Sequence, residues 1–442
     1  MVESNLKIIT ELKSVITTIV NNDELKSLFV TNHNDFSRDR KLTIEKLIGI
    51  IINMPKRSLS IELNDFFNIL KDNKPATKSA FSLQRIKLLP VFFQVWNYFL
   101  VDCFYKYNAN NILRWKGFRL LAVDGSTANL VNKEDVINYF GTQNNQYSQA
   151  PMARIMQVYD VLNDMTIFSN IYPIKTSEKE IITNNINHLY SDSISIFDRG
   201  FPSYELMFLM CNEEKLKHFV IRCKVDFNNE VKLFMCSKKK SKIVELKPTP
   251  HAIAALKIKG FIITSKTTLK VRMVKVKLST GAVEVLLTNL YDEELYSNED
   301  LKHLYGLRWG IETSYGTQKN QLQIEQFSGH RVICIQQDFH ASTFVSNLQS
   351  LINKQCDDYI KKLNLKRKHA YKINRNVSWG SLKNNIVKLF LENNPRELLL
   401  QLQHSFQQNL EPIRVGRSYE RNTKVRFRRG KYRTLTNYKR AI

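Results

Sequence analysis

Four polar residues on one predicted helix have types and spacings that suit chemistry on phosphate. Residues 301–329 are expected to form a single helix, on which Tyr305, Arg308, Glu312 and Lys319 are separated by three, four and seven positions. These spacings place the side chains on one helix face. A carboxylate between cations can hold a divalent metal ion while Arg308 and Lys319 bind phosphate oxygens. The alternative is an ordinary solvated helix with a salt-bridged stripe. Glycines within the segment disfavour a free-standing helix by roughly 1 kcal/mol each, so close packing must account for them.

Two aspartates follow short apolar segments that predict buried strands. Residues 118–123 run directly into Asp124, and residues 193–197 run directly into Asp198. A single aspartate in this position is usually a turn former or a helix cap. Ligands of α/β sheets, however, bind beyond strand ends, and together with Glu312 these residues make an all-oxygen carboxylate set that suits Mg²⁺ or Mn²⁺. Two such ions about 3.5–4 Å apart can activate an oxygen nucleophile and stabilise the leaving oxygen in phosphoryl transfer.

Charge and cysteine content restrict the partner and the compartment. The 442 residues include 66 Lys and Arg against 41 Asp and Glu, a formal net charge of +25, which indicates a polyanionic partner and not merely a basic surface. No apolar run approaches the roughly 20 residues that span a bilayer, and the N-terminus lacks signal-peptide features. Nucleic acid is therefore favoured over a membrane. The six cysteines are far apart without a CxxC pair, which disfavours a zinc site or a disulfide framework and fits a reducing cytoplasm.

The first part of the chain, residues 1–110, is predicted to be helical because apolar residues recur at helical spacing. Within residues 74–90, a short basic helix between two others could enter a DNA groove, with Lys78 and Arg85 as contacts. A plain helical hairpin is the alternative. Residues 91–107 are too apolar and aromatic for a surface helix and are expected in the core.

The pattern then alternates between strands and helices. Residues 111–223 predict an α/β domain with a mixed sheet, including a hairpin at 153–174. Residues 224–290 have a β texture throughout and are interpreted as an inserted β-rich subdomain. Residues 291–345 return to the α/β domain with the charged helix. Residues 346–442 predict a helical C-terminal region that ends in a basic tail.

The basic tail is a second candidate DNA contact. Residues 413–442 contain eleven Lys or Arg and a single acid, with aromatic residues interleaved among the charges. This pattern fits a segment that follows a nucleic-acid backbone, and Arg426, Arg428 and Arg429 are its candidate contacts. A mobile solubilising tail is the alternative.

These motifs resemble those of the insertion-sequence DDE transposases. The resemblance is carried by VDGS at 123–126, by FDRGFPSYEL at 197–206, and by the Tyr, Arg, Glu and Lys of the charged helix, with two, three and six residues between them. The last set is similar to the Tyr-Arg-Glu-Lys signature of the IS-four family. FVIRCK at 219–224, TKSAFS near the N-terminus and the NYKRAI ending also resemble family sequence, so the similarity extends over nearly the whole chain.

The resemblance implies a fold and a metal site. The fold is a ribonuclease H-like catalytic domain, interrupted by the β-rich insertion and flanked by a helical N-terminal DNA-binding domain and a helical C-terminal region. Asp124, Asp198 and Glu312 are implied as the catalytic residues and as ligands of two Mg²⁺ ions, for which Mn²⁺ would substitute. Tyr305, Arg308 and Lys319 are implied as contacts to transposon-end DNA, at phosphates near the cut.

The implied activity is cut-and-paste transposition. Such an enzyme cleaves double-stranded DNA at terminal inverted repeats and joins the 3′ ends to target DNA, working as a homodimer on DNA in the bacterial cytoplasm, where DNA binding associates it with the nucleoid. A transposase-derived DNA-binding protein that no longer cuts is the main alternative, although the presence of all three acids argues against it. A general nuclease of the same fold is the third interpretation.

Overall fold

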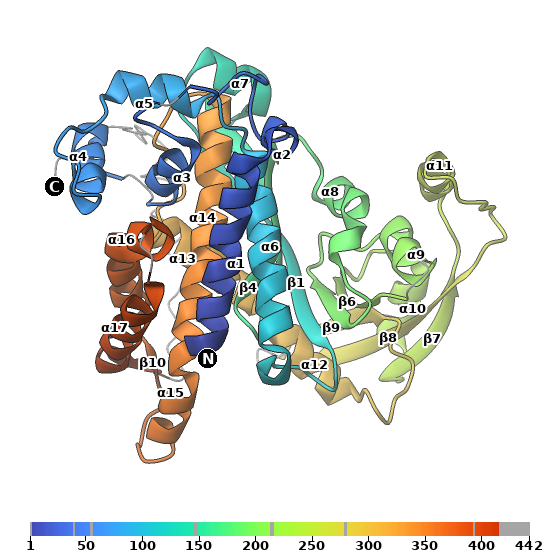
Figure 1. Cartoon of the computed structure of the whole chain (residues 1–442). Helices are drawn as coiled ribbons and strands as arrows, with labels where there is room; N and C mark the ends of the chain where they lie inside the picture. The colour runs from blue at the N-terminus through green and yellow to red at the C-terminus, as the bar shows by residue number, and fades with distance from the viewer. Residues whose placement is uncertain are drawn as a thin grey trace.

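A mixed β-sheet runs through the chain, and helices cover both of its faces (Figure 1). The structure is a computed structural model that describes residues 2–38, 40–53, 56–144, 149–212, 216–277, 281–391 and 394–414. The alternation of strand and helix segments produces this mixed α/β architecture, which confirms the predicted class. The sheet order is β2-β3-β1-β5-β6-β9-β8-β7, with β4 paired to β3. The strands are β1 (Arg119–Asn129), β2 (Thr142–Asn144), β3 (Gln149–Asp160), β4 (Met165–Pro173), β5 (Ser193–Phe197), β6 (His218–Cys223), β7 (Ser241–Leu246), β8 (Leu269–Lys277) and β9 (Val283–Thr288).

The chain before β1 is helical, as its apolar spacing predicts. Thr43 and Thr77 cap the helices that follow them by accepting hydrogen bonds from backbone N–H groups. The helix over residues 91–107 is core, as expected: its Trp96 is buried and stacks on Phe344 with ring centroids 3.9 Å apart. The helices are α1 (Val2–Asn21), α2 (Asp23–Ser27), α3 (Ile44–Ile52), α4 (Leu59–Ile69), α5 (Lys78–Arg85) and α6 (Val91–Tyr107).

Further helices connect the strands and form most of the chain after β9. The longest of them, α14, packs against α6 and β4, and α6 packs in turn against α1 (Figure 1). These helices are α7 (Glu134–Phe140), α8 (Glu178–Asn184), α9 (Tyr204–Asn212), α10 (Asn229–Cys236), α11 (Pro250–Ile258), α12 (Asn298–Gly306), α13 (Trp309–Asn320), α14 (Val332–Asn353), α15 (Asp357–Asn364), α16 (Arg375–Leu391) and α17 (Pro395–Gln408). Short strands β10 (Tyr371–Ile373) and β11 (Leu410–Pro412) pair with each other, and single 3₁₀ turns lie at Ala109–Asn111, Ile186–His188 and Lys354–Cys356.

The two neighbours of β1 differ in direction and length. β1 pairs antiparallel with β3 as far as Asn129, but it pairs parallel with β5 only up to Val123, which lies opposite Phe197. β5 pairs parallel with β6, and β6 joins β9 in the antiparallel sense. Since β5 ends beside the middle of β1, the second half of β1 has β3 as its pairing partner on one side only.

Side chains of the central strands alternate between two cores. Val123 of β1 and Phe197 of β5 belong to the core that also contains residues of α6 and α14. Ala122 and Ile196, one position earlier in each strand, belong to the opposite face, which is covered by α13 and α12. Because strand side chains alternate with a period of two, the residue after each strand-end apolar residue faces α12 and α13.

The stretch 224–290 is not β throughout, contrary to the sequence-based expectation. Helices α10 and α11 lie within it, and Asn228 and Thr249 cap them by accepting backbone hydrogen bonds. A short apolar segment fits a half-buried helix as well as a strand, so periodicity alone could not separate the two. Strands β8 and β9 of this stretch pair antiparallel, and they extend the main sheet through the pairing of β6 with β9.

The single helix predicted for residues 301–329 is wrong, because the segment forms two helices, α12 and α13. At their junction, the backbone N–H groups of Leu307, Arg308 and Gly310 donate to carbonyls three residues back, which is a tight 3₁₀ turn. A Cβ atom on Gly310 would lie 3.2 Å from Cγ1 of Val161. The glycine therefore allows α13 to pack closely on the β3–β4 turn.

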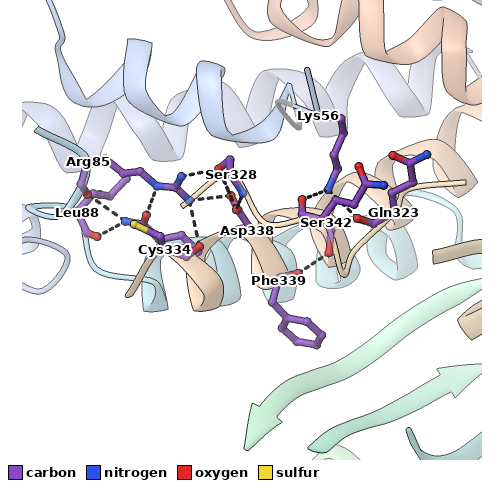
Figure 2. Close-up of polar contacts among 11 residues, drawn as sticks. Lys56, Arg85, Leu88, Gln323, Ser328, Cys334, Asp338, Phe339 and Ser342 are labelled. Atoms are coloured by element: carbon purple, nitrogen blue, oxygen red, sulfur yellow. Dashed lines mark hydrogen bonds and ion pairs between the residues drawn. The ribbon is translucent and has the colours of Figure 1, made fainter. Parts of the chain in front are cut away.

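Arg85 lies in the interior, which overturns its prediction as a DNA contact. The side chain is 1% exposed and forms an ion pair with Oδ1 of Asp338 at 2.7 Å (Figure 2). Its guanidinium also donates to Oγ of Ser328, to Oε1 of Gln337 at 2.6 Å and to the carbonyl of Cys334 at 3.0 Å. A cation with these partners is not available to a phosphate. The sequence could not show this, because the partners are about 250 residues away.

The segment between α13 and α14 is thereby attached to the N-terminal helices. Besides Arg85, the Lys56 amine donates to the carbonyl oxygens of Gln323 and Gln326, both at 2.8 Å (Figure 2). A Cβ atom on Gly329 would lie 2.6 Å from Cβ of Cys334, so the glycine is needed for this close approach. These contacts fix the position of the segment that follows α13.

Replacing Arg85 by Met should lower the free energy of unfolding by about 3–5 kcal/mol, because Asp338 would remain buried with its main cationic partner removed. Urea denaturation followed by circular dichroism would measure the loss. The double variant Arg85→Met/Asp338→Leu should recover part of it, since both charges are removed. A single variant as stable as the parent protein would contradict the structural role assigned to this ion pair.

Candidate active site

Asp124 and Asp198 occupy equivalent positions on neighbouring parallel strands. Asp124 follows Val123 and Asp198 follows Phe197, the last residues of the β1–β5 pairing. Both therefore point to the sheet face that α12 and α13 cover. Asp124 lies inside β1, which runs on to Asn129, and not beyond a strand end as the sequence suggested. The neighbouring strand β5 ends at Phe197, opposite Val123, so no β5 residue pairs with Asp124. The Asp124 carboxylate therefore faces the helices that cover this side of the sheet.

The guanidinium of Arg308 connects two of the three predicted acids. It contacts Oδ2 of Asp124 at 3.3 Å and Oε1 of Glu312 at 2.7 Å. The Arg308 side chain is itself buried, at 8% residue exposure. It comes from the 3₁₀ turn between α12 and α13, one helical turn before Glu312. The helix junction thus places a cation between a strand carboxylate and a helix carboxylate.

Asp198 is held by a phenol and a second arginine. Tyr305 donates its hydroxyl to Oδ1 of Asp198 at 3.1 Å, and the Arg222 guanidinium lies 2.9 Å from the same oxygen. Arg222 also pairs with Glu284 of β9 at 2.8 Å. The last residue pair between the parallel strands β5 and β6 is Phe197 with Ile221. Arg222 and Asp198 are the next residues after this pair, which explains why their side chains meet.

The pKa values differ between the two aspartates. Burial raises the pKa of Asp124 to about 6, although Arg308 and the backbone N–H of Gly125 act in the opposite direction. Burial would also raise the pKa of Asp198, but the N–H of Arg199 and the charges of Arg222 and Arg308 bring it below its ordinary value. Arg308 therefore acts electrostatically on Asp198 as well, so all three acids share its field.

Lys319, the last of the four charged-helix residues, reaches β1. Its amine donates to Oγ of Ser126 at 2.8 Å and to the carbonyl of Thr127 at 2.6 Å. Tyr315, four residues earlier, donates to the backbone carbonyl of Asp124 at 2.9 Å. Both contacts attach α13 to the strand that carries Asp124. Tyr305, Arg308 and Lys319 thus all point toward the carboxylate cluster.

A fourth carboxylate, Glu178 at the start of α8, lies beside the site and was missed by the sequence reasoning. A Cβ atom on Gly125 would lie 2.2 Å from its Oε1, so Gly125 makes room for it. Glu178 forms an ion pair with Arg154 of β3 at 2.5 Å, and its charge contributes to the raised pKa of Asp124. Arg222 was also missed. Two features of the sequence could have indicated these residues. Gly125, directly after Asp124, makes room for Glu178, and the arginine of the FVIRCK motif is Arg222 itself.

The carboxylates fit a divalent cation in their chemistry but are arranged around a guanidinium. Across the described ranges, no group of three or more His, Cys, Asp or Glu side chains is arranged to hold a metal ion. The donor set itself is all oxygen, and partial burial raises the pKa of Asp124, so its negative charge is disfavoured at this position. Arg308 supplies the cation that Asp124 and Glu312 contact.

The remaining predicted DNA contacts have different locations. Lys78 is exposed at the start of α5, two helical turns before buried Arg85. Arg426, Arg428 and Arg429 lie outside the residues that the structure describes, which end at residue 414.

Comparison with known families identifies the chain. The profile of the family described as the transposase DDE domain matches residues 115–348. This range covers more than half of the 442 residues and includes β1, β5 and α13 with their three acids. The chain therefore belongs to the transposase DDE domain family.

Comparison with individual proteins adds little to the family match. No curated protein sequence matches this chain. Among solved structures, it is similar to a piggyBac transposase in a synaptic complex with hairpin DNA, at 12% sequence identity and a TM-score of 0.39, over 90% of this chain and 87% of that chain. A TM-score of this size does not establish a shared fold. No helix in the described part of the chain is long and apolar enough to cross a membrane.

Replacing Asp124 by Asn should stabilise the metal-free protein at about pH 7.5, by an amount on the order of 1 kcal/mol, because it removes a half-buried charge. The pKa of Asp124, about 6, lies above its ordinary value of 3.8. The folded protein therefore binds more protons than the unfolded chain between these values, and the stability contributed by Asp124 falls as the pH rises through about 6. The advantage of the variant should shrink at about pH 5. Thermal unfolding in chelator at both pH values measures this.

Asp198→Asn is the matched control, with the opposite expected sign. Because the pKa of Asp198 is lowered in the folded state, its charge stabilises the protein at about pH 7.5, and this stabilisation is lost as the pH falls through the folded-state pKa. The Asn variant should therefore unfold at a lower temperature than the parent protein at about pH 7.5. Equal shifts for both variants would show that the two carboxylates do not differ in environment.

Proposed function

We propose that this chain is an insertion-sequence transposase of the IS-four type, which cleaves DNA at terminal inverted repeats and joins the 3′ ends to target DNA. One observation carries the proposal: a single guanidinium, that of Arg308, contacts both Asp124 and Glu312 and lowers the pKa of Asp198. Asp124, Asp198 and Glu312 lie between 74 and 188 positions apart in the sequence, and they form one acidic cluster around this guanidinium. The chain belongs to a family whose members are DDE transposases.

The proposed catalytic fold is ribonuclease H-like. It is supported by the placement of β1 between the antiparallel pair β3–β4 and the parallel strands β5 and β6. The proposed division assigns residues 1–110 to DNA binding, 111–223 and 291–345 to catalysis, 224–290 to the insertion and 346–442 to the C-terminal region. The contacts of Arg85 and Lys56 support a rigid attachment of the first region to the end of the charged helix.

Asp124, Asp198 and Glu312 would hold two Mg²⁺ ions, and Mn²⁺ would serve in their place. Such ions supply an activated oxygen nucleophile and charge stabilisation of the leaving oxygen. The chain's own residues do the positioning. Tyr305 orients Asp198 through its hydrogen bond, and Lys319 attaches α13 to β1 near Asp124.

Arg308 is the residue proposed to link DNA binding to the acidic cluster. While it pairs with Asp124 and Glu312, these carboxylates are compensated by its charge. A DNA phosphate is a bidentate partner for a guanidinium and would compete for it. On DNA binding, Arg308 would release the two carboxylates and hold the phosphate. The active site would therefore become able to bind cations when DNA is present.

The DNA-bound form is proposed to be a homodimer on double-stranded DNA, with transposon ends and target DNA as ligands. A binding protein that no longer cuts is the second candidate. It is favoured by one observation, the absence of a preformed metal-binding group in the described residues. Incubation of the protein with Mg²⁺ and DNA carrying the inverted repeats that flank its gene separates the two, since the second candidate binds this DNA without nicking it.

Glu312→Gln should reduce cleavage of inverted-repeat DNA by about a thousandfold or more, because loss of a metal ligand removes several kcal/mol of transition-state stabilisation. Binding of the same DNA should change little, since the phosphate-binding cations remain. Gel assays of nicking and fluorescence anisotropy would measure both quantities. Glu299→Gln, the same substitution at an exposed position of α12, is the control and should cut normally. Undiminished cleavage by the Glu312 variant would remove this residue from the site.

Arg308→Ala should bind Mn²⁺ more tightly than the parent protein in the absence of DNA. The expected decrease in Kd is about tenfold, the factor for a competent arrangement that is one-tenth populated in the parent protein. Electron paramagnetic resonance of free Mn²⁺ would measure it. Lys302→Ala, on the exposed side of α12, should leave the Kd unchanged.

The same variant should bind DNA more weakly and with a smaller salt dependence, because a phosphate contact is lost. Equal Mn²⁺ affinities for the parent protein and the Arg308 variant would contradict the proposed competition between guanidinium and cation.

A further inference from the structure

A basic hollow lies beside Asp198 and is separate from the cluster of three acids. It has a volume of about 240 Å³ and is lined by Lys179, Arg199, Gly200, Pro202, Lys224 and Phe227. We refer to these six residues as the basic hollow. None of the sequence motifs assigned a role to its three cations.

The topology of the sheet brings the cations together. Arg199 directly follows Asp198, beyond the end of β5, and Lys224 directly follows β6. Since β5 and β6 are parallel neighbours, the segments after them leave the sheet at the same edge. Lys179 comes from the first turn of α8 and donates to the carbonyl of Pro202 at 3.1 Å. This hydrogen bond fixes the third cation in the lining of the hollow.

The positive charge of the basic hollow is not compensated by the protein. Its lining contains no acidic residue. Neither Arg199 nor Lys224 forms an ion pair with any residue that the structure describes. Burial and the nearby charge of Lys224 lower the pKa of Lys179, which shows that the two amines repel each other. An anion in the hollow would offset this repulsion.

A larger adjoining cavity is a weaker candidate for an anion. It has a volume of about 790 Å³ and shares Lys179, Pro202 and Phe227 with the basic hollow. Its lining, however, also includes Glu180 and Glu205, and Glu205 lies 3.8 Å from a lysine amine of the same cavity. The positive charge there is partly neutralised by the protein itself, whereas that of the basic hollow is not.

We propose that the basic hollow binds a backbone phosphate of the DNA strand that passes the carboxylate site. The inference rests on the proposed function and extends it to residues outside the DDE cluster. Arg199 and Lys224 would contact the phosphate oxygens, and the ring of Phe227 would lie against the adjoining sugar or base. Because Arg199 neighbours Asp198, a phosphate held here fixes the strand next to the acidic cluster. The strand belongs either to the transposon end or to the target DNA.

Arg199→Ala and Lys224→Ala test the proposal, with Lys257→Ala, an exposed lysine of α11 outside the hollow, as the matched control. Affinity for an inverted-repeat duplex and for an unrelated duplex would be measured by fluorescence anisotropy at several salt concentrations. Each hollow variant should lose about threefold to tenfold in affinity, and its salt slope should decrease by about one, as expected for one lost phosphate contact. The control should bind as the parent protein does. Arg199→Lys, which keeps the charge, should recover most of the affinity.

The two duplexes identify the source of the phosphate. A loss confined to the inverted-repeat duplex assigns the hollow to the transposon end, and a loss on both duplexes assigns it to DNA of any sequence, including the target. If the parent protein binds and cuts its inverted repeats while both hollow variants keep the parent affinity and salt slope, the hollow is not a phosphate site. If the parent protein neither binds nor cuts this DNA, the proposed function fails and the hollow assignment fails with it.

Discussion

The arrangement of this protein depends on one electrostatic problem, the placement of several carboxylates within reach of each other in a half-buried site. Asp124 carries the clearest sign of this problem, since burial raises its pKa to about 6. Arg308 reduces the repulsion by contacting Asp124 and Glu312 together. Asp198 obtains its own compensation from Arg222 and Tyr305. Without these cations the acids could not share one face of the sheet at a tolerable free energy.

Several parts of the fold serve to place that one guanidinium. Arg308 lies in the 3₁₀ turn between α12 and α13, and Gly310 lets this turn approach β3 and β4 closely. Farther along, the segment after α13 is attached to the N-terminal helices through Arg85 and Lys56. The N-terminal helices therefore influence the position of the site through the segment that follows α13, in addition to any contact they make with DNA. This connection gives a physical reason for the main sheet and the helical N-terminal region to behave as one body.

The cations near the site fall into two groups, those that pair with carboxylates and those that do not. The net +25 would favour any polyanion, but only some cations are available for one. Arg85, Arg222 and Arg308 pair with carboxylates, whereas Arg199 and Lys224 have no acidic partner in the described part of the chain. Apart from Arg308, which is proposed to exchange its carboxylate partners for a phosphate, the paired cations organise the protein and the unpaired ones remain for a ligand. The distinction between the two groups is therefore more informative about DNA binding than the total charge.

The sequence by itself determined the α/β class and the two buried strands that lead to Asp124 and Asp198, because a short apolar run is a local property of the chain. It also determined the spacing that places Arg308 one turn before Glu312. Only the tertiary structure decided which partner each side chain meets: Arg85 is buried against Asp338, and the helix predicted over residues 301–329 is broken by a tight turn. The reason is that residue type and periodicity fix local geometry and direction. Pairings across 100 or 250 positions depend instead on how separate elements pack, and a single chain's sequence does not encode them locally.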